Sequence, residues 1–347
     1  MPGLPPIPEG ATVVADGLWN PTNILFGEDG TLYIAESGVS GGGGPDEGAM
    51  ATPNAEGTPF PGPTMLIPGQ VSKLAADGTL SVLGGGLGSA VGLAIWNGKL
   101  YVSAGGGSIG MGFAEAAGEN TISTIDLASG EVATLTTLGQ YEAENNPDGT
   151  DVNPNLYGIA VDANGLLYVN DAGGNTIYTV DTTSGDFNLF TVVPNLETLT
   201  GATPVPVEQS RQPVPTGIAI DADGLIHVSL LSEAWTGPSL LTYTPDGEYT
   251  AGPGPLAAVV SITIGPDGLL YATQLSDNLE QAEPAPGSIK RINADGSVDT
   301  VVEGLFFPHG LAFDADGALY VTVNSIISGP DAPLGQVIKI DGIATPA

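Results

Sequence analysis

The chain has no cysteine among its 347 residues, and it has only two histidines. Without cysteine, disulfide bonds and thiolate metal sites are excluded. Two histidines cannot form a zinc site with three imidazole ligands. Helical patterns are also missing, because no long run of good helix formers places apolar residues at helical spacing.

Basic residues are scarce. Six lysines and arginines stand against 39 aspartates and glutamates, so the net charge is −33. Such a surface repels phosphate backbones and anionic lipids, so we expect no nucleic-acid partner, and cations are the natural small partners. No run approaches the roughly 20 apolar residues that span a bilayer, so we expect no membrane insertion. Low basicity together with the missing cysteine favours a secreted or periplasmic protein.

Glycine, proline and short apolar runs are abundant instead. There are 52 glycines and 29 prolines, while hydrophobic residues make up 41% of the sequence. This composition is too apolar for a disordered chain and too interrupted for a helical one. Runs of Val, Ile, Leu and Tyr between glycines therefore predict an all-β protein.

One phrase, Gly, apolar, Ala, apolar, Asp, followed by Gly and Tyr-Val, occurs six times. The clear copies are 157–169, 216–228 and 309–321, and the weaker copies are 23–34, 92–102 and 261–272. Within each copy an Asp-Gly or Asn-Gly pair supplies the turn of a β-hairpin. A second hairpin follows in five cases, which makes units of four strands. The sequence therefore predicts a six-bladed β-propeller of four-stranded blades.

The sixth copy ends before its fourth strand, and the N-terminus supplies a candidate for that strand. The segment 11–18 resembles 299–305, the outer strand of the fifth unit. We therefore predict that residues 11–15 form the outer strand of the last blade and close the ring. The propeller domain would cover 11–343, between a flexible lead-in of 1–10 and a tail of 344–347.

Long insertions fall in only one of the two sets of connections between predicted strands, at 37–68, 103–119, 139–156, 193–215, 230–238, 274–287 and 323–334. The short Asp-Gly turns belong to the opposite face. We call the first face the long-loop face, and we expect function there, around the central channel. The candidate ligand-binding residues on it are Thr22, Asn23, Tyr157, Asn170, Thr216, Gln274 and Asn324.

The densest polar segment, 142–155, has the composition of a metal-binding loop. Carboxylate and amide oxygens beside a glycine suit Ca²⁺ or another divalent cation, and the candidate ligands are Asn146, Asp148, Asp151 and Asn153. The alternative is a turn-rich loop whose side chains cap their own backbone. We expect no organic cofactor.

The candidate catalytic residues are His309, Glu36 and Asp171. His309 stands at the start of the last inner strand, and the two carboxylates stand at the ends of second strands. A neutral imidazole near a carboxylate can transfer protons or bind a metal. The alternative is that His309 is a hydrogen-bonded residue of the channel rim.

Five segments resemble the ScyD/ScyE family: NPTN at 20–23, LYIAE at 32–36, ENNPDG at 144–149, NLYG at 155–158 and NDAGGN at 170–175. The similarity covers about 11–341. It implies an NHL-type, secreted or periplasmic bacterial propeller without established catalytic residues. More distantly, the chain is similar to gluconolactonases and streptogramin lyases, which implies a divalent metal at the channel mouth.

Two functions stay open at this point. The first is a binding module that holds a small molecule, a polymer or a protein on the long-loop face, with calcium ordering the loops. The second is a metal-dependent hydrolase or lyase at the channel mouth that uses His309 and Glu36, with Asp171 nearby.

Overall fold

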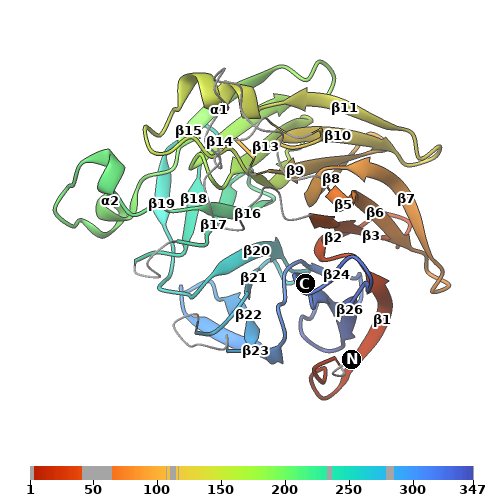
Figure 1. Ribbon diagram of the computed structural model, residues 1–347. Helices are drawn as coiled ribbons and strands as arrows, with labels where there is room; N and C mark the ends of the chain where they lie inside the picture. The colour runs from red at the N-terminus through yellow and green to blue at the C-terminus, as the bar shows by residue number, and fades with distance from the viewer. Residues whose placement is uncertain are drawn as a thin grey trace.

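The computed structural model describes residues 4–40, 65–106, 108–109, 115, 117–232, 237–278 and 285–346. These residues form six antiparallel sheets of four strands, arranged as blades around a central channel (Figure 1). The predicted six-bladed β-propeller of four-stranded blades is therefore confirmed.

The blades follow one another along the chain, and in each of them the first strand lines the channel and the fourth lies at the outer edge. Blade 1 has β2 (Pro21–Phe26), β3 (Leu32–Glu36), β6 (Gly69–Leu74) and β7 (Leu80–Leu87). Blade 2 has β8 (Ser89–Trp96), β9 (Lys99–Gly105), β10 (Thr121–Asp126) and β11 (Val132–Thr137). Blade 3 has β12 (Leu156–Val161), β13 (Leu166–Asp171), β14 (Thr176–Asp181) and β15 (Phe187–Val192).

Blade 4 has β16 (Pro215–Ile220), β17 (Ile226–Leu230), β18 (Leu240–Tyr243) and β19 (Tyr249–Ala251). Blade 5 has β20 (Val259–Ile264), β21 (Leu270–Gln274), β22 (Gly287–Ile292) and β23 (Val298–Leu305). Blade 6 has β24 (Leu311–Phe313), β25 (Leu319–Val323), β26 (Gly335–Ile340) and, as its outer strand, β1 (Ala11–Leu18).

Strand β1 closes the ring. It pairs antiparallel with β26, from Ala11 opposite Ile340 to Leu18 opposite Gly335, so the first and last strands of the chain share one sheet (Figure 1). The predicted closing strand is confirmed, and it extends three residues beyond 15, to Leu18. Before it, the side chain of Ile7 packs against the core of blades 5 and 6.

Short turns and long insertions separate onto the two faces, because connections alternate between faces in an antiparallel blade. On the short-turn face, Asp29 Oδ1 accepts a hydrogen bond of 3.0 Å from the backbone N–H of Thr31, and Gly30 has a φ of 80°. That φ favours glycine, as the Asp-Gly pattern requires. The insertions carry the remaining elements: β4 (Val39–Ser40), β5 (Met65–Ile67), α1 (Gly139–Asn145), α2 (Leu196–Thr200) and the 3₁₀ helix η1 (Val207–Gln209).

The two short helices are absent from the sequence prediction, since each fills part of an insertion and has too few residues for a periodic pattern. Among the described residues, no helix is long and apolar enough to span a membrane.

The hydrophobic core lies between adjacent blades. Between blades 2 and 3, for example, Ile122 packs with Leu156, Leu167 and Tyr178, all of them fully buried. Each such side chain contributes about 1.5–3 kcal/mol to the free energy of folding. Because every blade uses both faces of its sheet in this way, the inner strands are held at fixed positions around the channel.

The repeat glycine lets the inner strands approach each other closely. A Cβ on Gly158 would lie 2.2 Å from the carbonyl oxygen of Thr216 in the next blade. A Cβ on Gly310 would lie 2.3 Å from the carbonyl oxygen of Thr22, where blade 6 meets blade 1. Both distances are far below van der Waals contact, so the spacing of the blades requires glycine at these positions.

Candidate functional site

The mouth of the channel on the long-loop face is crossed by a hydrogen bond between opposite blades. The hydroxyl of Tyr157, at the start of β12, lies 2.5 Å from Nε2 of His309, just before β24. The two rings are nearly parallel, with centroids 5.6 Å apart and an interplanar angle of 24°. Since blades 3 and 6 face each other across the ring (Figure 1), this pair spans the channel.

Both rings of this pair are neutral near pH 7. Burial lowers the pKa of His309 from 6.5 to about 4, and burial also raises the pKa of Tyr157 above its usual value of 10.0. The imidazole is 6% exposed, and its Nδ1 is buried without a hydrogen-bond partner among the described residues. The site therefore presents one unsatisfied imidazole nitrogen beside a phenol.

The backbone around His309 holds its ring at the mouth. Its N–H donates to the carbonyl oxygen of Thr322 at 3.1 Å, and the N–H of Gly310 donates to the carbonyl oxygen of Thr22 at 2.9 Å. Phe307, two residues earlier, has a φ of 42°, and the N–H of Ser325 donates to its carbonyl oxygen at 3.2 Å. The imidazole is thus placed by backbone bonds to two neighbouring segments.

Three of the candidate ligand-binding residues join neighbouring blades. Thr22 Oγ1 lies 2.9 Å from the carbonyl oxygen of Ala90 in blade 2, and Thr216 Oγ1 lies 2.8 Å from that of Val259 in blade 5. Asn170 Nδ2 donates to the carbonyl oxygen of Thr216 at 2.9 Å. Thr22, Asn170 and Thr216 are also buried. Their hydroxyl and amide N–H groups have partners inside the protein, whereas Asn170 Oδ1 has none among the described residues.

The remaining candidate ligand-binding residues, Gln274, Asn324 and Asn23, form hydrogen bonds within their own blade or with the segment that leads into it. Gln274 and Asn324 are buried, and they donate to the carbonyl oxygen of Ala257 at 3.1 Å and to Gln336 Oε1 at 3.1 Å. Asn23 lies in the channel, where its Oδ1 accepts a hydrogen bond of 2.8 Å from the N–H of Ile24. Of the seven candidates, Tyr157 is the one bonded to His309.

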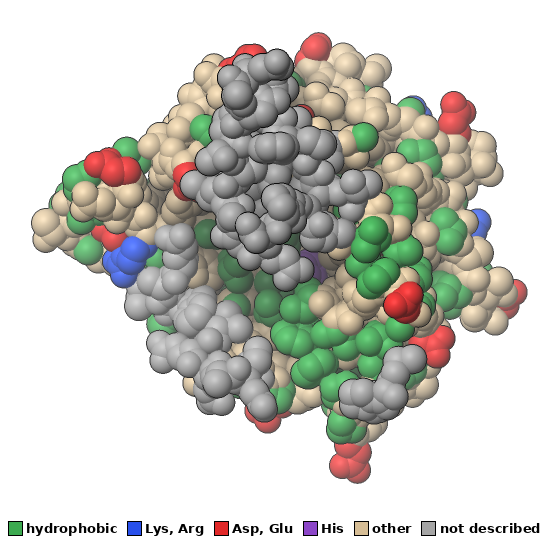
Figure 2. All heavy atoms as spheres, in the orientation of Figure 1, with side chains coloured by type: hydrophobic (Ala, Val, Ile, Leu, Met, Phe, Trp, Pro, Cys, Tyr) green, Lys and Arg blue, Asp and Glu red, His purple; other side chains and the backbone are tan. Residues whose placement is uncertain are grey.

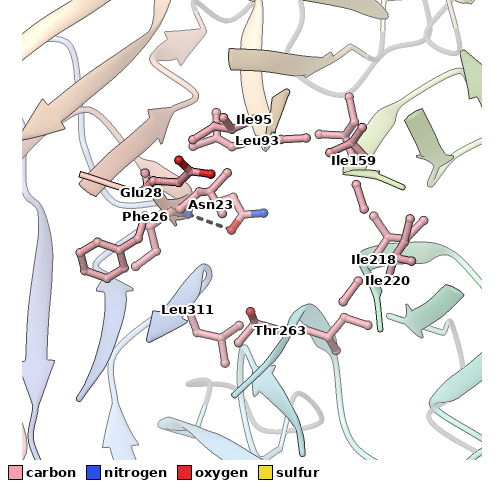
Figure 3. A pocket seen from close by; sticks show the side chains of 18 residues that line it. Asn23, Phe26, Glu28, Leu93, Ile95, Ile159, Ile218, Ile220, Thr263 and Leu311 are labelled. Carbon is pink, nitrogen blue, oxygen red and sulfur yellow. Dashed lines mark hydrogen bonds between the residues drawn. The ribbon is translucent and has the colours of Figure 1, made fainter. Parts of the chain in front are cut away.

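The channel contains a cavity of about 390 Å³ (Figure 3). Isoleucine and leucine side chains from all around the ring project into it, among them Leu93, Ile159, Ile218 and Leu311. Among its described lining residues, Glu28 is the one with a charge. The side chains that line this cavity are therefore mainly apolar, whereas the Tyr157–His309 pair lies at the mouth of the channel.

Glu36 is a buried carboxylate whose oxygens both accept hydrogen bonds. Its Oε2 accepts from the N–H of Trp19 at 2.6 Å, and its Oε1 accepts from Gln70 Nε2 at 2.9 Å and from Ser72 Oγ at 2.5 Å. The carboxylate is 0% exposed. Its partners are therefore within blade 1 and the segment that enters it, whereas the side-chain partner of His309 is Tyr157.

Asp171 is also buried, but its two oxygens differ. Its Oδ1 accepts hydrogen bonds from the N–H groups of Asn155 and Gly174, at 2.8 and 2.9 Å. Its Oδ2 has no partner among the described residues. Burial raises the pKa of Asp171 to about 6. Nearby Glu142, on α1, is 0% exposed, and neither of its carboxylate oxygens has a partner among the described residues. Burial together with neighbouring carboxylates raises the pKa of Glu142 to about 8.

The predicted metal-binding loop is held together mainly by its own hydrogen bonds. Asp148 accepts from the N–H and the hydroxyl of Thr150, at 3.0 and 2.7 Å, and from Asn175 Nδ2 at 2.7 Å. Asp151 is exposed and accepts from Gln212 Nε2 at 2.9 Å. The backbone carbonyl of Asn153 lies against Gly173. In the described ranges, no group of three or more His, Asp or Glu side chains has the geometry of a metal site.

The side chain of Asn146 is the exception in this loop. Its Nδ2 donates to the carbonyl oxygen of Thr150 at 2.7 Å, whereas its Oδ1 is buried without a partner among the described residues. Asn146 is one of the ligands predicted from the sequence, whereas Glu142 is not. The available signal was the place of Glu142 at the start of the polar segment 142–155.

The residues that precede the repeat glycine at the mouth do not fit the divalent metal implied by the distant resemblance. These positions hold no carboxylate: they are Thr22, Val91, Tyr157, Thr216, Val260 and His309. Divalent cations in oxygen-rich sites are held mainly by carboxylates. We therefore derive no chemistry through a metal at the mouth.

The long-loop face also carries hydrophobic side chains. They gather over blades 5 and 6, while acidic side chains lie mainly at the rim (Figure 2). Ile326, in the connection from β25 to β26, is 56% exposed, and the rings of Phe306 and Phe307 are in contact, with centroids 4.6 Å apart. Phe306 and Phe307 directly precede His309 along the chain, and Ile326 follows it in the next connection.

No family model and no curated protein sequence matches the chain. Solved structures do match. A protein of unknown function from Bacteroides thetaiotaomicron superimposes with a TM-score of 0.60 at 13% identity, over 95% of this chain and 74% of that one. A gluconolactonase from Xanthomonas campestris gives a TM-score of 0.57 at 13% identity, covering 95% and 88%.

Virginiamycin B lyase from Staphylococcus aureus, in a structure with quinupristin, gives a TM-score of 0.53 at 15% identity, covering 95% of this chain and 97% of that one. At such identities these matches show the fold alone. The structural neighbours of this chain are six-bladed propellers of the NHL-like and gluconolactonase type.

Proposed function

We propose that this protein is a secreted or periplasmic, NHL-like propeller of the ScyD/ScyE type that binds a ligand at the channel mouth of its long-loop face. The observation that carries the proposal is the Tyr157–His309 pair, in which a buried imidazole nitrogen has no partner among the described residues. A buried polar atom of this kind costs about 1–3 kcal/mol when it is unsatisfied, so a ligand that bonds to it gains affinity.

The surroundings of the pair define the chemical class of the ligand. The net charge of −33 disfavours anions, and the apolar surface of Phe306, Phe307 and Ile326 favours a ligand with apolar parts. We therefore propose an uncharged or cationic molecule, or a segment of a polymer or protein, with an apolar face and one hydrogen-bonding group for His309 Nδ1.

The test is a binding screen by thermal shift, with uncharged, cationic and anionic compounds of matched size. Hits should come from the first two groups, and their affinity should fall about tenfold in Tyr157→Phe and in His309→Asn, through loss of a buried hydrogen bond. Asp246→Asn, on the exposed short-turn face, is the control and should keep wild-type affinity. Hits that bind all three variants equally would place the site elsewhere.

A second function, hydrolysis or elimination, is favoured by the protonation state of His309. A neutral imidazole bonded to a phenol can accept a proton from a substrate or from water. One of the matching structures is described as a catalytically inactive His→Ala variant of virginiamycin B lyase. Turnover on a panel of lactones and esters that is lost in His309→Ala would support an enzyme, whereas binding without turnover supports the first proposal.

A further inference from the structure

Two buried carboxylates meet at the entrance to blade 3 without enough donors. Glu142 projects from α1, and Asp171 ends β13. Both residues are 0% exposed. Neither oxygen of Glu142 and only one oxygen of Asp171 has a hydrogen-bond partner in the part of the chain that the structure describes.

The unpartnered oxygens point at the same small space. A Cβ built on Gly174 would lie 3.0 Å from Glu142 Oε2 and 3.1 Å from Asp171 Oδ2. The bare backbone of Gly174 therefore leaves room between the two carboxylates that any side chain would fill. The connection from β13 to β14, which contains Gly174, is thus shaped around this pair.

Among the described residues, no positive charge is found to act on Glu142. The charges that act on Glu142 come from Asp171, Asp148 and Asp151, all of them acidic. A third oxygen, Oδ1 of Asn146, is buried and unpartnered among the described residues, and the N–H of Asn146 bonds to the carbonyl oxygen of Glu142 at 2.8 Å. Leaving several buried oxygens unsatisfied is costly unless a cation or a proton lies among them.

The same repeat position in blade 1 shows the alternative solution. Glu36 ends β3 as Asp171 ends β13, and it is equally buried. Both of its oxygens, however, accept hydrogen bonds from Trp19, Gln70 and Ser72. A buried carboxylate in this fold can therefore be satisfied by protein donors, whereas the described residues supply none to Glu142 and none to Asp171 Oδ2.

We infer that Glu142 and Asp171 bind one Ca²⁺-like divalent cation, with Asn146 Oδ1 as a further ligand. Carboxylate and amide oxygens are the ligands that Ca²⁺ prefers, and backbone oxygens or waters complete its shell. The cation ties α1 to the connection after β13, and so fixes the 138–155 insertion that leads directly into Tyr157. This site differs from the loop set first predicted, because Asp148 and Asp151 already accept hydrogen bonds.

The test begins with the wild-type protein, stripped with EDTA and dialysed into calcium-free buffer. Addition of CaCl₂ should release or absorb heat in titration calorimetry and raise the melting temperature by about 3–5 °C once calcium is some hundredfold above its Kd. Magnesium should be weaker, because it prefers a strict octahedral shell that keeps its waters. This arm needs no ligand of the channel mouth, so its outcome is independent of the proposed function.

Variants then locate the site. Glu142→Gln and Asp171→Asn should each lower calcium affinity about tenfold or more and remove the rise in melting temperature. Glu36→Gln is the matched control and should keep wild-type calcium affinity. Terbium luminescence gives a second measurement on folded protein. Tyr178 is close enough to Asp171 and Glu142 for their charges to act on it, so its ring should excite a terbium ion bound there. The luminescence should therefore fall in Tyr178→Phe.

Two results would overturn the inference. One is a wild-type protein that shows neither calcium heat nor a melting shift, which would mean that the two carboxylates share a proton instead. The other is calcium binding that is unchanged in both Glu142→Gln and Asp171→Asn, which would place the cation elsewhere on the acidic surface.

Discussion

Tyr157 and His309 are 152 positions apart in the sequence, yet the Tyr157 hydroxyl lies 2.5 Å from the His309 imidazole across the channel. The bond joins blade 3 to blade 6, the pair of blades that face each other in the ring. It is a link between opposite sides of the propeller, in addition to the contacts between neighbours.

The first prediction concerns this link. Tyr157→Phe keeps the ring but leaves His309 Nε2 without its partner, so the free energy of unfolding should fall by about 1–3 kcal/mol. Urea denaturation measures the loss. Tyr33→Phe is the control, because the Tyr33 hydroxyl has no hydrogen-bond partner among the described residues, and this variant should change stability far less. Equal stability of both variants would show that the cross-channel bond contributes nothing.

The second prediction concerns pH. The folded pKa of His309 is lowered to about 4 from the 6.5 of a free imidazole, so between these values the unfolded chain binds a proton that the folded chain does not. The contribution of neutral His309 to the free energy of unfolding is therefore full above about pH 6.5. It is lost as the pH falls to about 4, by up to about 3 kcal/mol.

Other groups titrate in the same range, so the difference between the wild type and His309→Gln isolates the effect. Their difference in unfolding free energy should shrink from pH 7 to pH 4. An NMR titration of the His309 ring provides the direct check. A midpoint near 6.5 would contradict the burial that the structure shows.

The third prediction concerns the repeat glycine. Gly158→Ala should destabilise the propeller by about 1–3 kcal/mol or more, because the new Cβ would lie 2.2 Å from the carbonyl oxygen of Thr216 and would push two inner strands apart. Gly329→Ala is the matched control, since nothing lies within 4 Å of its Cβ position. Thermal unfolding of the two variants under one condition should separate them clearly.

The fourth prediction concerns ring closure. Leu18, the last residue of β1, is 1% exposed, whereas Val13 in the same strand is 37% exposed. Leu18→Asp should therefore lower the melting temperature strongly by burying a charge, while Val13→Asp should have a small effect. If both variants melted like the wild type, β1 would not contribute to the closed ring.

Much of the fold could be predicted from the sequence because short sequence patterns specify its turns and strands. Asp-Gly pairs indicate tight turns, and alternating apolar runs indicate strands. Because both patterns recur in each predicted blade, they indicate a propeller. Even the closure by 11–15 followed from a local likeness to the strand at 299–305, and the structure confirms that pairing with β26. The positions of the long insertions follow from the same alternation of faces.

The chemistry of the polar residues depended on contacts that local sequence does not contain. Glu36 and Asp171 hold the same place in the repeat, but both oxygens of Glu36 accept hydrogen bonds, whereas Asp171 accepts them on Oδ1 alone and lies beside another carboxylate, Glu142. The sequence by itself determined the ring, its closing strand and the face with the long loops. The tertiary structure decided which side chains are satisfied, because a buried polar group depends on partners that arrive from distant segments when the ring closes.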